Sequence, residues 1–324
     1  MAFNYLNKLL GLQSADFYTL AIELYKYQLA NNAVYRSWAQ LMPAFDGQRI
    51  TSIPALPVSF FKTHKVLTGH FEPAIIFESS GTTGMVNSRH YVKDLSIYET
   101  SFIKGFEHFY GHITDWCVLA LLPAYLEREG SSLVYMANHL IKASGHPQSG
   151  FYLYNQTDLA TVLASLEAAA QPTILIGVTF ALLDFAANYP QTLKHTLVLE
   201  TGGMKGRGKE LVRKELHEKL KIGFGQEAIH GEYGMTEMLS QAYAKGGGKY
   251  YCSPYMKVLV RGEDDPFDVR EVGEGLLQII DLANVHSCSF IATQDMGKVY
   301  ADGSFEIYGR VDHADLRGCS LLVV

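Results

Sequence analysis

The sequence lacks runs of basic residues, clustered cysteines and long uninterrupted apolar stretches. Its 324 residues include 27 lysines and arginines against 33 aspartates and glutamates, which gives a net charge of -6 at pH 7. A nucleic-acid backbone or an anionic membrane surface would find little counter-charge on such a chain. We therefore expect no nucleic-acid partner.

Features of membrane-spanning and secreted proteins are also missing. The two most apolar stretches, residues 116–126 and 173–187, are interrupted by Pro123, Gly177 and Asp184. Both stretches fall short of the ~20 apolar residues that a membrane helix requires. The first residues show no basic start followed by an apolar stretch and a cleavage site. We expect a cytoplasmic protein without membrane insertion.

The four cysteines, Cys117, Cys252, Cys288 and Cys319, are widely separated and include no CxxC pair. This spacing argues against a zinc site and against a disulfide framework. Because 48% of the residues are hydrophobic, the chain can bury a large core, which excludes a disordered or fibrous protein.

Between residue 73 and about residue 250, short apolar runs alternate with segments of helical period. Turn residues bound the runs, and apolar residues recur between them every three or four positions. This alternation predicts an α/β fold of mostly parallel sheets flanked by helices. An amphipathic helix is predicted at residues 16–39. The apolar runs are residues 74–77, 117–122, 173–176 and 196–199.

After about Tyr250 the helical period stops and strand-like segments follow. Asp302-Gly303 joins the last two of them, and this dipeptide is a strong hairpin signal because it tolerates positive backbone angles. The sequence therefore predicts an α/β body at residues 1–250, with an N-terminal helical segment, and a β-rich subdomain at residues 251–324. The predicted strands are residues 256–260, 276–280, 298–300 and 305–308.

A loop of small residues, Glu78-Ser-Ser-Gly-Thr-Thr-Gly84, directly follows the first apolar run. Such residues let backbone amides approach phosphate oxygens closely, and the hydroxyls add further donors. An ordinary loop between a strand and a helix has the same composition, so this stretch alone leaves both interpretations open. The candidate phosphate-binding residues are Ser79, Ser80, Gly81, Thr82, Thr83 and Gly84.

A second polar stretch, Gly231-Glu-Tyr-Gly-Met-Thr-Glu237, follows the run Glu227 to His230. Tyr233 offers a flat face for an adenine ring, and Thr236 offers a hydroxyl. Glu237 is a candidate Mg²⁺ ligand, because Mg²⁺ prefers carboxylate and phosphate oxygens. The alternative is a turn with a buried tyrosine and a helix-capping glutamate. His230 stands at a strand end and is given no role.

The third stretch runs from residues 291–296 to residues 309–312, across the predicted hairpin. Asp295 could accept hydrogen bonds from both hydroxyls of a ribose, and Arg310 could neutralise phosphate or fix the ribose. As isolated residues, such an Asp and Arg would more often form a surface salt bridge.

In this order, the three stretches resemble the adenylate-forming superfamily of acyl-CoA ligases and acyl-protein synthetases. The SSGTTG loop is matched at residues 79–84, and the YGxTE motif at residues 233–237, which adds Gly234 to the candidates. Asp295 matches the ribose aspartate, and residues 309–312 match the GRxD hinge. The resemblance covers about residues 50–319 and implies adenine-side glycines at Gly202 and Gly203.

The resemblance implies the large-domain fold of these enzymes and the use of ATP and Mg²⁺. It implies that a carboxylic acid attacks the α-phosphate, that pyrophosphate leaves, and that the acyl-AMP is passed to a thiol. The physical task is to stabilise the charge that develops at phosphorus, which amides, hydroxyls and Mg²⁺ do.

Two features depart from most of the superfamily. No lysine closely follows Gly84, where only Arg89 could supply a positive charge, and phenylacetate-CoA ligase-like members share this departure. The mobile carboxy-terminal domain with its catalytic lysine has no counterpart after Asp312.

This ending resembles the LuxE-type acyl-protein synthetases. Their example implies Cys319 as the acyl acceptor, a fatty acid as the substrate and a fatty-acid reductase subunit as the partner. Neighbouring Arg317 would favour the Cys319 thiolate.

Other interpretations stay open. The acceptor could be CoA, or the chain could be a non-catalytic relative that binds an acid or acts as a scaffold. Gly203-Met-Lys-Gly-Arg-Gly-Lys-Glu210 nearly fits the phosphate-binding pattern GxxxxGK[ST]. A glutamate at position 210 would meet the phosphates with like charge, so a glycine-rich turn before a basic helix is favoured there.

Overall fold

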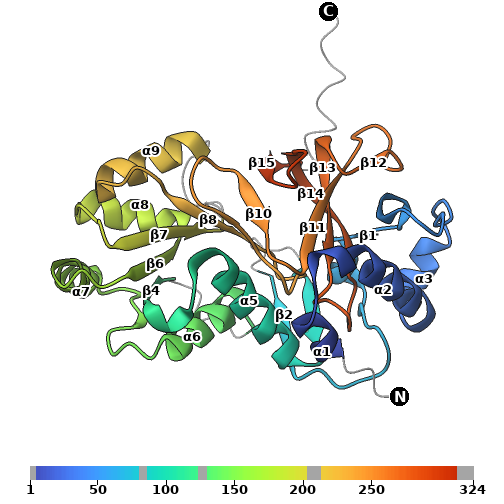
Figure 1. Ribbon diagram of the computed structural model, residues 1–324, viewed down its shortest axis with the longest axis horizontal. Coiled ribbons are helices and arrows are strands. Elements are labelled where there is room, and N and C mark those ends of the chain that lie inside the picture. Colours follow the sequence, from blue (N-terminus) through green and yellow to red (C-terminus); the bar gives the residue numbers. More distant parts are fainter. Residues whose placement is uncertain (1–4, 80–85, 123–129, 203–212, 312–324) are drawn as a thin grey trace, which may run out of the picture.

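The computed structural model describes residues 5–79, 86–122, 130–202 and 213–311. Within these ranges, thirteen strands form one hydrogen-bonded sheet and two more strands form a hairpin. The large sheet is parallel at one end and antiparallel at the other (Figure 1). The described residues therefore form an α/β fold, as the sequence predicts, but only one half of the sheet is parallel.

The parallel half is built from the middle of the chain. All neighbouring strands in it are parallel. Its two central strands are buried at every position, which explains their unbroken apolar sequence. In spatial order the strands are β5 (Gly150–Phe151), β4 (Cys117–Leu121), β6 (Thr173–Val178), β7 (Thr196–Thr201) and β8 (His230–Tyr233).

Helices cover both faces of the parallel half. They are α5 (Leu95–Tyr110), α6 (Ser132–Ser144), α7 (Gln156–Ala168), α8 (Thr179–Asn188) and α9 (Arg213–Phe224). α8 and α9 lie on one face, and α5 and α6 lie on the other (Figure 1). Asp94, Ser131 and Asn155 begin three of these helices as N-caps, each accepting a hydrogen bond from a first-turn amide.

The antiparallel half follows without a break in hydrogen bonding. β9 (Ala242–Ala244) pairs with β8, β10 (Tyr250–Cys252) pairs with β9, and β15 (Phe305–Arg310) pairs with β10. The remaining strands are β11 (Met256–Arg261), β12 (Val269–Arg270), β13 (Gly273–Asp281) and β14 (Phe290–Val299). The division of the chain near residue 250 stays a prediction.

The predicted single helix at residues 16–39 is wrong: the structure contains α2 (Phe17–Asn31) and α3 (Ala33–Ala39), with Asn32 extended between them. The fully buried Asn32 side chain accepts a hydrogen bond from the Tyr35 amide and donates to Thr68 Oγ1 at 3.2 Å and to the Ser287 carbonyl at 3.0 Å. These bonds hold the break, because asparagine favours caps and turns over helix interiors.

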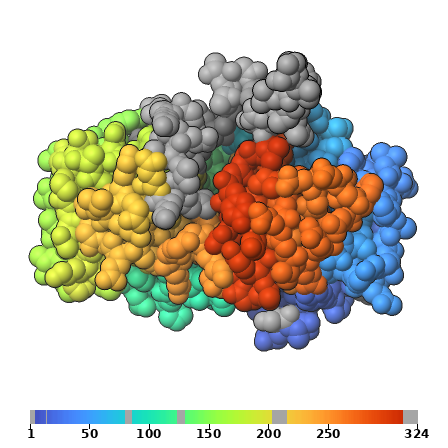
Figure 2. Space-filling view, turned by 90° about the horizontal axis from the view of Figure 1, so that it is seen from above, coloured from blue at the N-terminus to red at the C-terminus, as the bar shows by residue number. Residues whose placement is uncertain are grey.

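The amino-terminal segment lies beside the antiparallel half, as Figure 2 shows from above. β1 (Leu56–Pro57) runs parallel to β14. β2 (Ile75–Glu78) and β3 (Arg89–Val92) form the separate hairpin. The other helices are α1 (Tyr5–Leu10), α4 (Phe60–Thr63) and the short 3-10 turns Ser14–Asp16, Ile50–Ser52 and Ile113–Asp115. Among the described helices, none has the length and apolar character needed to cross a membrane.

Replacing Asn32 by alanine should lower the free energy of unfolding by about 2–3 kcal/mol, since a cap is lost and buried acceptors lose their donor. Urea denaturation followed by circular dichroism measures this change. Asn31→Ala is the matched control, because the exposed Asn31 side chain donates to Tyr27 O within its own helix. That control should cost less than about 0.5 kcal/mol. Equal losses in the two variants would contradict the assignment.

Candidate functional site

Three of the predicted site residues meet around one carboxylate. Asp295 of β14 accepts a hydrogen bond from Tyr233 Oη at 2.7 Å and another from Arg310 Nε at 3.0 Å. Tyr233 ends β8, whereas Asp295 and Arg310 face each other on paired strands. The Asp295 side chain is 8% exposed and that of Arg310 is 59% exposed. The Asp295 carboxylate is therefore buried and the Arg310 side chain is exposed, whereas both partners of an ordinary surface salt bridge are exposed.

The Tyr233 phenol stays protonated in this contact. Burial raises the pKa of Tyr233 well above its usual value, and the neighbouring Asp295 carboxylate raises it further. The phenol is consequently a donor to Asp295. A carboxylate has about four acceptor positions, so Asp295 retains capacity for the hydroxyls of a ligand.

Glu237 lies at a second point of the site, close to the base of the predicted phosphate loop. Ser79 and Ser88 are joined by two bonds: Ser79 N donates to Ser88 O at 3.0 Å, and Ser88 N donates to Ser79 Oγ at 2.8 Å. The Ser88 side chain in turn hydrogen-bonds the Glu237 carboxylate. The structure thus brings Ser79 and Glu237 together although 157 positions separate them in the sequence.

Electrostatics link Glu237 to the Asp295 group. Burial raises the pKa of Glu237, while the Ser88 hydrogen bond and the charges of Arg310 and Lys62 oppose that rise. The charge of Arg310 therefore acts on both the Asp295 and the Glu237 carboxylates, so the two parts of the site are electrostatically coupled.

Two residues that the sequence analysis did not single out hold the Thr236–Glu237 backbone. Asn284 Nδ2 donates to Glu237 O at 2.7 Å, and His90 Nδ1 lies 2.8 Å from Thr236 O. His90 Nε2 is also 2.9 Å from Asn284 Oδ1. Burial lowers the pKa of His90 to about 4, so the ring is neutral and its single N–H serves one of these acceptors. No motif in the sequence marks His90 or Asn284.

The structure also contains two buried acids, Glu200 and Glu232, that the sequence did not mark as candidates. Thr201 Oγ1 donates to Glu232, and Thr179 Oγ1 contacts both Glu200 and the Gly202 carbonyl. Burial raises the pKa of Glu232 to about 7, and the charge of Glu200 adds to the rise although the Thr201 bond opposes it. Glu200 had a signal in the sequence, because it directly follows the apolar residues of β7, whereas Glu232 lies in the polar strand β8 and had none.

Backbone geometry gives two of the candidate glycines a physical role. Gly202 has φ +71°, a left-handed conformation that favours glycine. At Gly234 an added Cβ would lie 2.7 Å from Glu232 Oε1. The backbone at Gly202 therefore favours glycine, and a larger residue at position 234 would displace the Glu232 carboxylate.

Several predicted residues lie outside the described ranges. They are Ser80, Gly81, Thr82, Thr83, Gly84, Gly203, Asp312 and Cys319. Arg89, the candidate substitute for the missing lysine, is described: its Nε lies 3.2 Å from Glu78 Oε1 on the exposed hairpin. Arg89 therefore pairs with the residue that opens the phosphate loop.

The donor set fits a magnesium ion that is also held by a nucleotide. In the described ranges, no three His, Cys, Asp or Glu side chains gather as a metal site. Glu237 is a single carboxylate, and Mg²⁺ is commonly bound by one or two carboxylates together with phosphate oxygens and water. A zinc-type cage would need more protein ligands than Glu237 and its neighbours offer.

Comparisons of the sequence alone find nothing: no protein-family model matches it, and neither does any curated protein. Comparisons of the fold do find similar structures. ATP-bound MatB from Rhodopseudomonas palustris has a TM-score of 0.54 at 17% identity, over 72% of this chain and 47% of that one. An open conformation of 2-hydroxyisobutyryl-CoA ligase with 2-HIB-AMP and CoA has a TM-score of 0.65 at 9% identity, over 93% and 70%.

O-succinylbenzoate coenzyme A synthetase (MenE) from Bacillus subtilis, in complex with AMP, has a TM-score of 0.50 at 17% identity, over 72% and 49%. This chain thus spans about half the length of MatB and of MenE. It has the fold of the adenylate-forming ligases, which confirms the predicted fold class. The LuxE-type subfamily stays a prediction.

Replacing Glu232 by glutamine keeps the shape of the side chain and an acceptor for Thr201 but removes the ionisation. The folded protein holds the Glu232 proton more tightly than the unfolded chain does, so ionisation costs stability. The variant should therefore gain stability relative to the wild type as the pH rises from about 4.5 to about 7, with no further gain above that.

Thermal denaturation across this pH range measures the difference in Tm between Glu232→Gln and the wild type. The control is Glu263→Gln, in the exposed loop before β12, whose difference should stay flat. A pH-independent difference for both variants would refute the elevated pKa of Glu232.

Proposed function

We propose that this protein activates a carboxylic acid as its acyl-adenylate with ATP and passes the acyl group to a cysteine thiol. The observation that carries the proposal is the convergence of Ser79, Glu237 and Asp295, from three distant stretches, through Ser88 and Arg310. The fold neighbours support it, since their structures contain ATP, AMP or an acyl-AMP.

In this proposal Asp295 binds the ribose. Its two oxygens are already oriented by Tyr233 and Arg310, so the acceptors are in place before the nucleotide arrives. The open guanidinium of Arg310 is left to contact phosphate. Gly202 and Gly234, with Tyr233 and the neighbouring Gly203, form the adenine side.

Glu237 and the phosphate loop act on the triphosphate. Mg²⁺, when bound, neutralises charge on the phosphate oxygens. Glu237 holds that ion, while Thr236 and the hydroxyls and amides of residues 79–84 donate to the phosphates. Burial of Glu237 strengthens these interactions, because charges act over a low dielectric there.

The chemistry balances in two steps. A carboxylate oxygen of the acid bonds to the α-phosphorus, the bond from that phosphorus to the bridging oxygen breaks, and pyrophosphate leaves with the electron pair. A thiolate then bonds to the acyl carbon, the acyl–phosphate C–O bond breaks, and AMP leaves.

Cys319 is the proposed thiol. Burial raises the pKa of Cys252 and of Cys288 to about 12, so neither is a thiolate near neutral pH. Burial also raises the pKa of Cys117. A fatty acid as substrate and a fatty-acid reductase subunit as acceptor partner complete the proposal, both on the resemblance to LuxE-type synthetases.

Asp295→Asn should raise the KM for ATP in pyrophosphate exchange at least about tenfold, equivalent to ~1.4 kcal/mol of lost binding. The assay follows labelled pyrophosphate entering ATP across a panel of fatty and aryl acids. Asp302→Asn, at the exposed tip of the same hairpin, is the control and should match the wild type. No exchange with any acid in the wild type would favour a non-catalytic scaffold.

Cys319→Ala should abolish covalent labelling by a radioactive acid in the presence of ATP, yet leave pyrophosphate exchange intact. Cys252→Ala should retain the label, because the pKa of Cys252 is far above neutral. Label that persists in Cys319→Ala would exclude that residue. Acyl-CoA formation by the wild type without protein labelling would identify a CoA ligase instead.

A further inference from the structure

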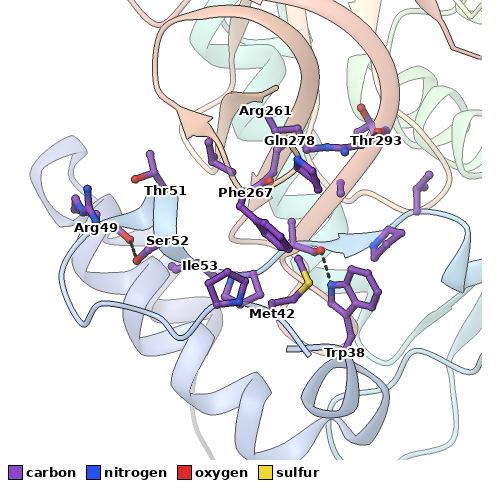
Figure 3. A pocket seen from close by; sticks show the side chains of 18 of the residues that line it. Trp38, Met42, Arg49, Thr51, Ser52, Ile53, Arg261, Phe267, Gln278 and Thr293 are labelled. Atoms are coloured by element: carbon purple, nitrogen blue, oxygen red, sulfur yellow. Dashed lines mark hydrogen bonds between the residues drawn. The ribbon is translucent and has the colours of Figure 1, made fainter. Parts of the chain in front are cut away.

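A separate cavity of about 590 Å³ lies between the antiparallel half of the sheet and the segment that follows α3. Its lining includes Ala292, Thr293 and Gln294 of the third stretch, but none of the residues assigned to the nucleotide. Its walls are largely apolar, with Trp38, Met42 and Phe267 lying around the interior (Figure 3). Pro54 and Pro57 add rigid apolar surface. A volume of this size suits a small organic ligand.

On one side of this cavity lies Arg261, a cation that forms no ion pair with a carboxylate of the described residues. Arg261 Nη2 donates to the Thr293 carbonyl at 2.8 Å, but Arg261 Nε is buried and has no hydrogen-bond partner. No ion pair joins Arg261 to any carboxylate in the described ranges, and burial alone lowers its pKa. A guanidinium held in this way is costly unless an anion completes it.

Gln278 supplies a second polar group beside Arg261. The residue is 3% exposed and lines the cavity. Figure 3 shows Gln278 on the same side of the cavity as Arg261 and Thr293, with Phe267 next to it. A buried amide and a half-buried guanidinium thus face one apolar space.

We propose that this cavity binds a small monocarboxylic acid with an apolar body. Arg261 and Gln278 would hold the carboxylate, and Trp38, Met42 and Phe267 would cover the apolar part. A neutral ligand would leave Arg261 Nε unpaired, whereas a polyphosphate would bring more negative charge than one guanidinium offsets. The nearest acid on the cavity wall, Asp46, is already paired with Arg49.

The inference stands apart from the proposed function, because it uses none of the same residues. It places a second acid-binding position close to the catalytic strand: Thr293 lines the cavity, and its Oγ1 accepts the amide of Asp295 at 3.1 Å.

Tryptophan emission can report binding directly, since the sequence has two tryptophans and one of them, Trp38, lines the cavity. Trp116→Phe leaves Trp38 as the single reporter. In this background, titration with decanoate should shift the Trp38 emission and saturate. Adding Arg261→Gln, which keeps a donor for Thr293 O but removes the charge, should weaken decanoate binding at least about tenfold. Decanol, the uncharged match, should bind both proteins equally.

Two further variants fix the position of the site. Arg270→Gln, which is exposed and does not line the cavity, should leave decanoate binding unchanged. Ala292→Phe should abolish binding of both ligands by filling the cavity while Arg261 itself is kept. If Arg261→Gln fails to fold, the Ala292→Phe result decides.

Decanoate that binds without changing Trp38 emission would place the acid elsewhere and overturn the proposal. Equal decanoate affinity in folded Arg261→Gln and in the Trp116→Phe background would overturn it as well, as would full binding in Ala292→Phe.

Discussion

The Asp295 carboxylate ties together the two halves of the sheet. Tyr233 reaches it from the last parallel strand, and Arg310 reaches it from the antiparallel strand next to its own. Its neighbours in sequence belong to β14, which pairs with β13, β15 and β1. A change in the angle between the halves would break one of these two bonds, so the geometry of the candidate nucleotide site and the twist of the sheet are set together.

Buried charge is used in two different ways around this site. Asp281 is fully buried, yet its oxygens accept hydrogen bonds from the amides of Leu239, Ser240 and Ala283 and from the Ser240 hydroxyl. These bonds fix the segment that follows Glu237, and they offset the desolvation that raises the pKa of Asp281. Glu232 and Arg261 have fewer compensating contacts.

The fold class could be predicted because burial on both faces leaves unbroken apolar runs, as in β4 and β6. The break at Asn32 could not, because it depends on Thr68 and Ser287, which are distant in sequence. Nor did the sequence show that the predicted strand at residues 298–300 is the end of β14, a ten-residue strand that also carries Asp295.

At the site, the motifs identified Ser79, Tyr233, Glu237, Asp295 and Arg310 as candidates, and the structure brings these residues together. Ser88, His90 and Asn284 were not predicted. Residues that position a neighbour through a hydrogen bond have no characteristic spacing in the sequence. Arg261 and Gln278 were not predicted for a related reason: the unpaired Nε of Arg261 and the burial of Gln278 are properties of three-dimensional packing, which no local pattern encodes.

The attachment of the first helices has a consequence for synthesis on the ribosome. Tyr5 donates to the Leu282 carbonyl, Gln28 to the carbonyls of Asn284 and Val285, and β1 pairs with Ile291 and Ala292. The amino-terminal segment can therefore pack against residues 282–292 only after some 250 further residues have been translated. Until then its apolar side chains remain without this packing surface. Contacts of such long sequence separation form late and slowly. Nascent chains of this protein should therefore need shielding from one another until residues 282–292 have been translated.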